Sequence, residues 1–444
     1  MQKIIQAVER YRQTILEAER FIWAHPETGY RERVTSDYMA QAFEALGYTL
    51  THAEGIPGFY TVIDTGREGP EVLVLGELDS IICPSHPNAD SKTGAVHACG
   101  HNAQCAALLG VAAALREPHM LDGLSGRIRL CAVPAEELLE LEYRSELKRQ
   151  GKIRFFGGKT EFLWRGYFDG VDMAFMVHTA LRFSINSGSV GCMTKRIIYK
   201  GRAAHAGGNP WDGHNALYAA NCGLNAANAL RETFREADII RFHPIVTNGG
   251  DMVNAIPATA VLESYVRGKE FEAIDDANRR INQALIGAAL SLNCNVDIID
   301  VPGYAPHRND EGMKLLARDA AAWLMPDFEI PFSDKIGSGS TDMGDLSAIM
   351  PVVHPYAAGQ EGASHGSDYR IADPEAACIT SAKWQLAMLF MLLEKGAERA
   401  RRILAEFTPR FASKGEYFAY LDKLEREGER IQYAEDGSAT VDLS

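Results

Sequence analysis

The strongest constraint on the fold is a series of short apolar runs that alternate with helical patterns. The run Glu71–Asp79 is apolar almost throughout and ends in two acids, which is typical of a strand buried on both faces. Two further strands are predicted over Gly126–Val133 and Val171–Val177, and a helix of small residues over Asn102–Glu117. Strand–helix alternation of this kind predicts an α/β fold with a mostly parallel sheet flanked by helices.

Polar side chains collect at the carboxyl ends of these predicted strands. Glu136 and Glu137 follow the second strand, while Asp79 and His178 close the first and the third. In open sheets of this class, ligands bind beyond the carboxyl ends of the strands. Each residue alone could be an ordinary loop residue, but four functional groups at equivalent positions favour a binding site.

Cys99 and His101 form a second candidate feature. Only Gly100 separates them, so in an extended segment their side chains leave the backbone on the same side. Both residue types are zinc ligands. A single Cys-x-His pair is weak evidence, because cysteine is often a small buried residue. By themselves these two residues leave the metal site and the buried core open as interpretations.

The pattern changes after about Ser184, where antiparallel strands are expected. The order of the predicted elements is β-α-β-β-α-β, with strands over Ser187–Tyr199, Arg241–Asn248, Ala260–Arg267 and Asn295–Val301 and helices over Asn215–Phe234 and Ala273–Leu292. This order matches a ferredoxin-like α+β sandwich. We therefore predict an inserted dimerisation domain at residues 185–301 and a discontinuous catalytic domain at residues 1–184 and 302–444. A chain of 444 residues also favours two domains over a single core.

Charge and cysteine content narrow the class of function. The net charge of −14 argues against nucleic acid or an anionic membrane as the main partner. The eight cysteines lack the dense spacing of a disulfide scaffold and are expected to be reduced. The N-terminus does not resemble a signal peptide, and no uninterrupted apolar run long enough to span a bilayer is apparent. We expect a cytoplasmic protein that acts on a small molecule.

Eight motifs along the chain carry a family resemblance. They are Glu77-Leu78-Asp79, His97–Asn102, Pro134–Glu137, His178, Gly201–Ala206, Asn254–Pro257, Ser340–Asp345 and His365. Their order is similar to that in the aminoacylase and carboxypeptidase G group of dinuclear metallohydrolases. Within that group, the chain resembles the amidohydrolase branch that contains aminobenzoyl-glutamate hydrolases, auxin-conjugate hydrolases and β-alanyl-lysine dipeptidases. The resemblance extends from about His25 to about Leu393.

The resemblance implies specific roles for ten residues. It implies that two divalent metal ions are held by Cys99, His101, Glu137, His178 and His365. It implies Glu136 as the general base and Asp79 as a carboxylate that orients a ligand or the base. His205 is similar to the histidine that this group sends from the inserted domain into the active site of a neighbouring subunit, so a homodimer or a higher homo-oligomer is expected. Asn254 and Arg267 are similar to groups that hold a substrate carboxylate or carbonyl.

Several of these residues have a simpler interpretation when each is taken alone. His178 could be a core histidine, His365 and His205 exposed loop histidines, and Arg267 a member of a surface ion pair. Taken together, the five implied ligands form a mixed nitrogen, sulfur and oxygen set that suits zinc, and manganese is also compatible with it.

Two features depart from the resemblance or add to it. Asn102-Ala103-Gln104 follows His101, where many members of the group have Asp-Gly-His. A carboxamide does not titrate, so an acid or ligand option is removed there. The charge-rich segment Glu140–Leu163 follows the Glu136-Glu137 pair and could shape the substrate pocket.

We therefore predict a metal-dependent amidohydrolase that cleaves the amide C–N bond of an N-acyl amino acid or dipeptide-like substrate. A metal-bound hydroxide would attack the carbonyl, with Glu136 as the general base. One alternative is hydrolytic deamination of an arylamine by the same chemistry. A second is a non-catalytic metal-binding relative, although the intact Glu136 beside Glu137 argues against it.

Overall fold

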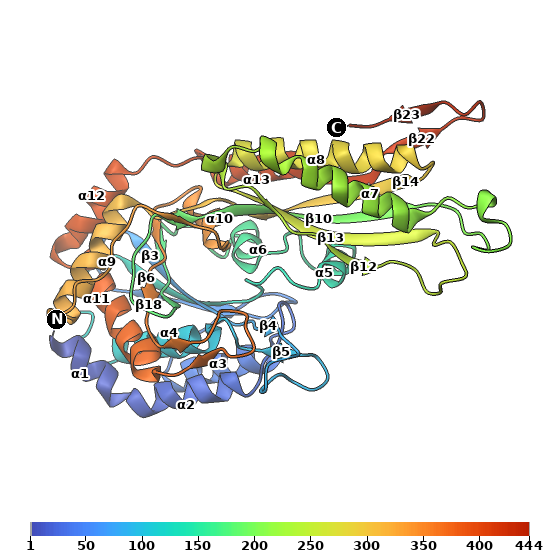
Figure 1. Cartoon of the computed structure of the whole chain (residues 1–444). Helices are drawn as coiled ribbons and strands as arrows, with labels where there is room; N and C mark the ends of the chain where they lie inside the picture. The colour runs from blue at the N-terminus through green and yellow to red at the C-terminus, as the bar shows by residue number, and fades with distance from the viewer. Residues whose placement is uncertain (1, 444) are drawn as a thin grey trace. The chain divides into compact units, whose positions relative to one another are not determined.

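The structure is a computed structural model that describes residues 2–443, and its chain separates into two units (Figure 1). The first unit comprises the chain up to Gly188 together with His307–Gly337 and Thr341–Lys414. The second comprises Ser189–Pro306, Ser338–Ser340 and the chain from Gly415 onward. The inner boundaries lie within a few residues of those expected from the sequence.

The first unit contains a mixed six-stranded sheet. Its strand order is β1 (Thr51–His52), β2 (Phe59–Asp64), β6 (Arg127–Val133), β3 (Glu71–Glu77), β7 (Met173–Phe175) and β17 (Val352–Val353). The pairs from β6 to β17 are parallel, whereas β1 pairs with β2 and β2 with β6 in antiparallel orientation. The expectation of a mostly parallel sheet therefore holds for the four strands β6, β3, β7 and β17 but not for the β1–β2 edge.

Burial explains this difference between the two parts of the sheet. All seven residues of β3 are buried, as expected for a central parallel strand. Strand β2 alternates between buried and exposed positions, which suits an antiparallel strand with one solvated face. The parallel strands carry the polar strand ends from which the candidate site is built.

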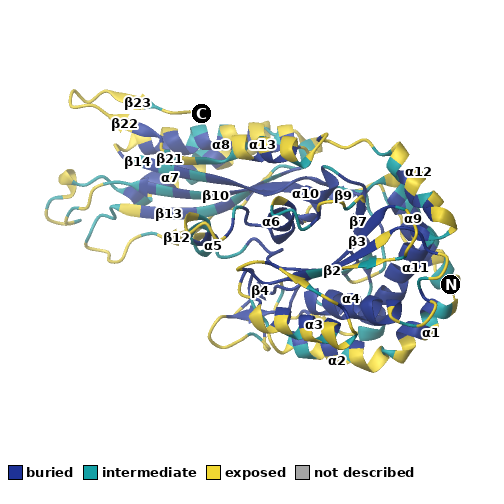
Figure 2. Cartoon of the chain, turned by 180° about the vertical axis from the view of Figure 1, so that it is seen from behind, coloured by how far each residue is buried: buried dark blue, intermediate teal, exposed yellow. Residues whose placement is uncertain are grey.

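The core of the first unit is centred on helix α4 (His101–Leu115). Every residue of this helix is buried, and it contacts α2 (Arg12–Trp23), strand β3 and α11 (Ser381–Leu393). Figure 2 shows α4 and β3 buried, while the outer faces of α2 and α3 (Arg33–Ala45) are exposed. Small side chains permit this close packing: a Cβ atom at Gly110 would lie 2.7 Å from Ile15 Cδ1 on α2.

One helix of the first unit has the length and hydropathy of a membrane span but is a core helix. The segment Glu375–Leu393 has a mean hydropathy of 1.5, and 89% of its apolar window is buried inside the structure. It comprises the π-helical turn η4 (Glu375–Thr380) and α11, and Trp384 Nε1 donates to Ala317 O on α9 (Glu311–Leu324) at 2.8 Å. The apolar side chains of this segment therefore pack inside the core of the first unit.

The second unit is an antiparallel sheet covered by two helices. Its main strands are β10 (Gly191–Lys200), β13 (Thr259–Gly268) and β14 (Asn295–Tyr304), with the short strands β11 (Arg241–Phe242) and β12 (Ile245–Asn248) beside β13. Helices α7 (Ala216–Ala229) and α8 (Phe271–Ser291) pack against each other and against the sheet. The element order from β10 to β14 is β-α-β-β-β-α-β, because the single strand expected over Arg241–Asn248 is divided into β11 and β12.

The C-terminal segment belongs to the second unit, whereas the sequence placed it with the first domain. Strand β21 (Arg426–Glu429) pairs with β14 and extends the sheet by one strand. Helix α13 (Lys414–Leu424) before it buries Tyr417, Phe418 and Leu421. A pairing of this kind between distant segments leaves no local signature in the charged sequence of β21.

Candidate metal centre

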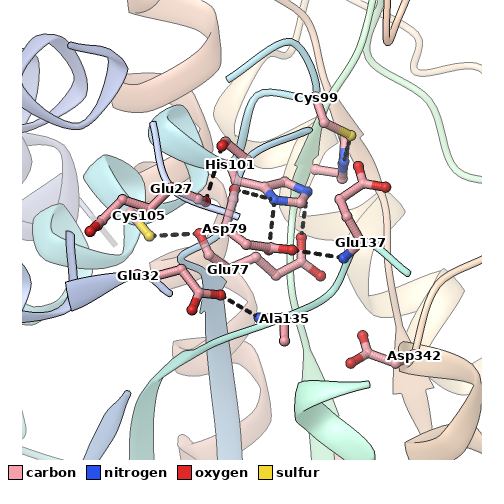
Figure 3. Close-up of polar contacts among 12 residues, drawn as sticks. Glu27, Glu32, Glu77, Asp79, Cys99, His101, Cys105, Ala135, Glu137 and Asp342 are labelled. Atoms are coloured by element: carbon pink, nitrogen blue, oxygen red, sulfur yellow. Dashed lines mark hydrogen bonds and ion pairs between the residues drawn. The ribbon is translucent and has the colours of Figure 1, made fainter. Parts of the chain in front are cut away.

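The candidate metal centre lies at the carboxyl end of the parallel strands in the first unit (Figure 3). Asp79 follows β3, Glu136 and Glu137 follow β6, and His178 begins β8 (His178–Thr179) after β7. Cys99 and His101 come from the turn that starts α4, in which Gly100 has a φ of 90°. This left-handed conformation favours glycine, because a Cβ would clash with the backbone. The topology thus places at one sheet edge residues that are far apart in the sequence.

All five implied ligands fall within groups of closely spaced donor atoms. Within each group the candidate ligand atoms lie within 4.8 Å of one another: Cys99, His101 and His178; Cys99, Glu137 and His365; His101, Glu136 and Glu137. Cys99 belongs to two of these groups, and its Sγ lies 3.5 Å from His178 Nε2. His365 Nε2 lies 3.0 Å from Glu137 Oε1.

Hydrogen bonds orient the imidazoles of His101 and His178. His101 Nδ1 lies 2.9 Å from the backbone oxygen of Asp79 and 3.2 Å from its Oδ1. His178 Nδ1 lies 2.6 Å from Thr179 O. Because all these partners are acceptors, each Nδ1 acts as the donor, and Nε2 is the ring nitrogen that a metal ion would bind once its proton is displaced.

Asp79 also connects the two strand ends. Its Oδ2 accepts a hydrogen bond of 2.8 Å from the backbone N–H of Glu137, and its other oxygen contacts His101. The Asp79 carboxylate is fully buried. Its position is that of a residue that orients ligands rather than one that belongs to a donor group.

The donor set fits divalent metal ions. His101 Nε2 and Glu137 Oε1 are buried and make no well-aligned hydrogen bond within residues 2–443. Buried polar atoms are normally satisfied, and here these atoms converge with a thiol and further imidazoles. A mixed set of sulfur, nitrogen and oxygen ligands is characteristic of zinc and compatible with other divalent ions.

The protonation equilibria of two implied ligands favour metal binding. Burial and Glu137 oppose ionisation of the Cys99 thiol, but the imidazoles of His101 and His178 outweigh them and lower its pKa to about 6. Burial likewise opposes ionisation of Glu137, but His365 and His101 hold the pKa of its carboxyl at about 2. Both groups are therefore ionised at neutral pH, as metal ligands must be.

Glu136 has the opposite environment. Burial and the carboxylates of Glu77 and Glu137 raise the pKa of Glu136 well above its usual range. Positive charge nearby lowers the pKa of a carboxyl, and the Lys159 ammonium acts on Glu136 in this direction. A buried carboxyl whose pKa depends on the cations around it is suited to accept and return a proton.

The loop that carries Glu136 is held on both sides. Ala135 has a φ of 58°, which is strained for a residue with a side chain. Its N–H donates to Glu32 Oε1 at 2.7 Å, and its carbonyl accepts from Gly158 N at 3.1 Å. The buried Arg144 guanidinium donates to the carbonyl of Glu137. The charge-rich segment Glu140–Leu163 thus supplies support for this loop.

Lys159 is a residue of this region that the sequence alone did not indicate. Its Nζ lies 2.5 Å from both Glu77 Oε1 and Asp342 Oδ1, and all three side chains are buried. Glu77 and Asp342 belong to motifs that carried the resemblance, but no periodicity or spacing connects Lys159 to them. A lysine in the first turn of the short helix α6 (Gly158–Trp164) offers no local signal of its partners.

The amide residues that depart from the family pattern face the helical core. Asn102 Nδ2 donates to Glu19 Oε1 on α2 at 2.8 Å. Gln104 is buried on α4, and its amide has no hydrogen-bond partner in the described part of the chain. Asn102 therefore serves the contact between α2 and α4.

The remaining three predicted site residues lie in the second unit. His205 Nδ1 accepts from the backbone N–H groups of Gly207 at 3.1 Å and Gly208 at 2.8 Å, so its exposed Nε2 carries the proton. The segment of Asn254 runs beside it, because Ala206 N donates to Asn254 O at 2.9 Å. Arg267 lies near the end of β13.

Arg267 is half-buried and has a hydroxyl rather than a carboxylate as its partner. Its Nη1 donates to Ser340 Oγ at 3.2 Å, and its guanidinium lies 5.4 Å from the centre of the Tyr265 ring. The surface ion pair that was an alternative for this residue does not occur among the described residues.

Comparison with known proteins finds relatives over most of the chain. The model of peptidase family M20/M25/M40 matches residues 74–389. The Xaa-Arg dipeptidase of Mus musculus is 26% identical over 402 residues, which cover 84% of each protein. A p-aminobenzoyl-glutamate hydrolase chain of Escherichia coli (strain K12) is 29% identical over 321 residues, which cover 69% of this chain and 62% of that protein.

A solved structure shares the fold. A dinuclear metal-binding peptidase of the M20 family from Bacillus subtilis has a TM-score of 0.64 and 18% sequence identity. The alignment covers 87% of this chain and 99% of that one.

Proposed function

The chain belongs to peptidase family M20/M25/M40 and is a metal-dependent hydrolase of amide bonds, and from this premise we propose that its substrate is an N-acyl amino acid or a dipeptide-like amide. The observation that supports this most directly is the convergence of Cys99, His101, Glu137, His178 and His365 in overlapping donor groups, with Glu136 beside His101 and Glu137. The two relatives are named as a dipeptidase and an aminobenzoyl-glutamate hydrolase, and both names describe amides of an amino acid. Neither arylamine deamination nor a non-catalytic role is favoured by any feature of the structure.

We assign two divalent ions to the donor groups that share Cys99. His101 and His178 accompany Cys99 in one group, and Glu137 and His365 accompany it in the other. When bound, the ions supply Lewis acidity that polarises a carbonyl and acidifies a water molecule. Zinc is the first choice because of the thiolate and imidazole ligands, and manganese is the second.

Glu136 is the proposed general base. Its carboxyl belongs to a donor group with His101 and Glu137, so it lies beside the implied ions without being one of the five ligands. It takes a proton from the attacking water and returns it to the leaving amine, a role that contributes about 10²–10⁴-fold to such reactions. Asp79 holds His101 and Glu137 in position for this step through its two carboxylate oxygens.

We further propose a homodimer formed through the free edge of the second unit's sheet. All four residues of β12 are exposed, and β12 pairs only with β13 among the described strands. Three large exposed apolar side chains line a groove beside this edge: Tyr218, Met252 and Val253. Ile245 on β12 itself is also exposed. An exposed apolar edge strand is an association site unless it is covered.

The dimer gives His205 a function. Its protonated Nε2 is exposed and is fixed as a donor by the two backbone N–H groups on Nδ1. In a partner's active site such a donor would stabilise the negative charge that develops on the carbonyl oxygen. Asn254 and Arg267 are the proposed groups for a substrate carboxylate, Arg267 through its planar fork.

A cytoplasmic location agrees with the cysteines. All eight are free, and seven of them are buried. We propose this location on that basis, because exposed pairs of thiols suited to disulfides are not found within residues 2–443.

A hydrolysis screen of the metal-reconstituted protein tests the proposed function. The panel contains dipeptides, N-acyl amino acids, aminobenzoyl-glutamate and arylamines, with product analysis for each. We expect amide hydrolysis by the wild type, and for Glu136→Gln the same metal content with no turnover. Ammonia release from arylamines alone would refute the substrate class, and an active Glu136→Gln protein would refute the base.

Hybrid dimers test the role of His205. Inactive His205→Ala and inactive Glu136→Gln proteins are mixed, and hybrids are purified by two different tags. Each hybrid then contains one site with an intact Glu136 and an intact partner His205, so part of the activity should return. Verified hybrids without activity would contradict the cross-subunit role.

A further inference from the structure

Glu136 also belongs to a buried group of carboxylates whose other two members, Glu77 and Asp342, have no role in the proposed metal chemistry. Oxygen atoms of Glu77, Glu136 and Asp342 lie within 4.8 Å of one another, and all three side chains are buried. Three carboxylates at this spacing repel one another strongly in a medium of low polarity. Such a cluster is stable only if a carboxyl is protonated or a cation lies among its members.

The cation in this group is the ammonium of Lys159. Its Nζ lies 2.5 Å from Glu77 Oε1 and 2.5 Å from Asp342 Oδ1, and its side chain is 0% exposed. The backbone N–H of Lys159 donates to the second oxygen of Asp342 at 2.8 Å. Burial opposes the charge on Lys159, but Asp342 and Glu77 outweigh it and raise its pKa.

Lys159 is placed there by the same contact that supports the Glu136 loop. Helix α6 begins one residue before it, and a Cβ at Gly158 would lie 1.6 Å from Pro134 O. Only glycine permits this approach of α6 to the end of β6. The position of the ammonium is therefore coupled to the backbone that carries Glu136.

Glu77 connects Lys159 to the metal centre, because it contacts both Lys159 and His101. One of its oxygens is bound to Lys159, and the other, Oε2, lies 3.1 Å from His101 Nε2. Asp342 lies at the start of α10 (Met343–Ser347), so Lys159 connects α6, the end of β3 and α10. Loss of the ammonium would leave two buried carboxylates uncompensated beside Glu136.

We propose that Lys159 is a positioning residue. Its ammonium is a fixed counter-ion for Glu77 and Asp342, and it holds these two carboxylates in place beside Glu136. This inference rests on the proposed function, in which Glu136 is the general base. Lys159 touches neither the substrate nor the ligands in this role. It acts on the turnover step by keeping Glu136 and its neighbours in place.

Two variants remove the charge by different routes. Lys159→Gln keeps a hydrogen-bond donor in the site but no charge. Lys159→Met/Asp342→Asn removes both partners of the pair, which costs less stability than removing one, and so protects the test if the single variant fails to fold. Asp342→Asn alone keeps the ammonium on Glu77 and serves as the reference for the double variant.

The chain offers a matched control in its second unit. Lys195 and Asp300 form another ion pair in which both side chains are 0% exposed, and Lys195 also contacts Asn282. Lys195→Gln and Lys195→Met/Asp300→Asn repeat the same chemistry outside the metal centre. These control variants measure how much the loss of a buried lysine charge lowers stability when the metal centre is not involved.

Four quantities are measured for each folded variant: kcat, KM, bound metal per chain and Tm. For Lys159→Gln and the Lys159 double variant we expect kcat to fall about 100-fold, within the range of a general-base contribution, with KM and metal content near the wild-type values. The Lys195 variants should lose Tm to a similar extent and keep kcat. Asp342→Asn should retain more kcat than the double variant.

Three outcomes would overturn the inference. A kcat within about threefold of wild type in a folded Lys159 variant would show that the charge is not needed. Loss of metal in proportion to kcat would place the effect on the ligands instead of on Glu136. An equal loss of kcat in the Lys195 variants would reduce the effect to stability. If the wild type itself hydrolyses no amide, the proposed function fails, and this result is distinct from all three.

Discussion

Asp79→Asn is the sharpest test of how the chain prepares the metal centre. One oxygen of Asp79 lies 3.2 Å from His101 Nδ1, and the other accepts from Glu137 N at 2.8 Å. Both partners are donors, and both contacts are buried. An asparagine has one oxygen and one NH2 group, so in either orientation one donor faces another donor.

The expected effect follows from this conflict. A buried donor left without an acceptor costs about 1–3 kcal/mol. If the cost falls on the arrangement that binds metal, the metal dissociation constant rises by about 5–150-fold, at 1.4 kcal/mol per factor of ten. This agrees with the 10–100-fold that is typical of residues that orient metal ligands.

Metal affinity is measured by titrating apoprotein in metal buffers, with hydrolysis and bound metal as two separate readouts. Activity should be regained at high metal concentration, because the five ligands are unchanged. Asp172→Asn is a suitable control: Asp172 Oδ2 accepts from Glu71 N at 2.8 Å at the opposite end of β3. Equal metal affinity in wild type and Asp79→Asn would refute the reasoning, and so would an equal loss in the control.

Three further predictions concern stability. Chelation should lower Tm and added metal should restore it, because ions at 100 times their dissociation constant stabilise a fold by about 2.7 kcal/mol. Calorimetry measures Tm in both states. An unchanged Tm would argue against ions bound through Cys99. Asp300→Asn should lower the free energy of unfolding by about 3–5 kcal/mol in denaturant titrations, because the buried Lys195 ammonium loses its charged partner. Gly110→Ala should cost about 1–3 kcal/mol, since its Cβ would meet Ile15 at 2.7 Å; a neutral effect would mean that α2 shifts freely.

Much of the candidate site could be predicted because its residues follow strands with a clear local pattern. The apolar run before Asp79 identifies β3, and the run before Glu136 identifies β6, so the carboxyl ends of the strands are visible in the sequence. The motifs around Cys99 and His101 added the metal interpretation. The structure brings Cys99, His101 and Glu136 into overlapping donor groups and places Asp79 in contact with His101.

The support of the site could not be predicted in the same way. Lys159 is 82 residues from Glu77 and 183 residues from Asp342. Glu32 is 103 residues from Ala135, and its Oε1 accepts a hydrogen bond from the Ala135 N–H. Such contacts depend on which segments the fold brings together, and the residues themselves look like ordinary charged surface positions.

The sequence by itself determined the strands, the helices that alternate with them and the polar residues at the strand ends, because period and burial are local properties of the chain. Only the tertiary structure decided that β1 and β2 form an antiparallel edge, that β21 joins the second sheet and that Asn102 serves the α2–α4 contact. It also decided that an ammonium sits among the carboxylates behind Glu136. The reason is physical: a buried charge is tolerated only beside its partner, and the partner is selected by the packing of distant segments.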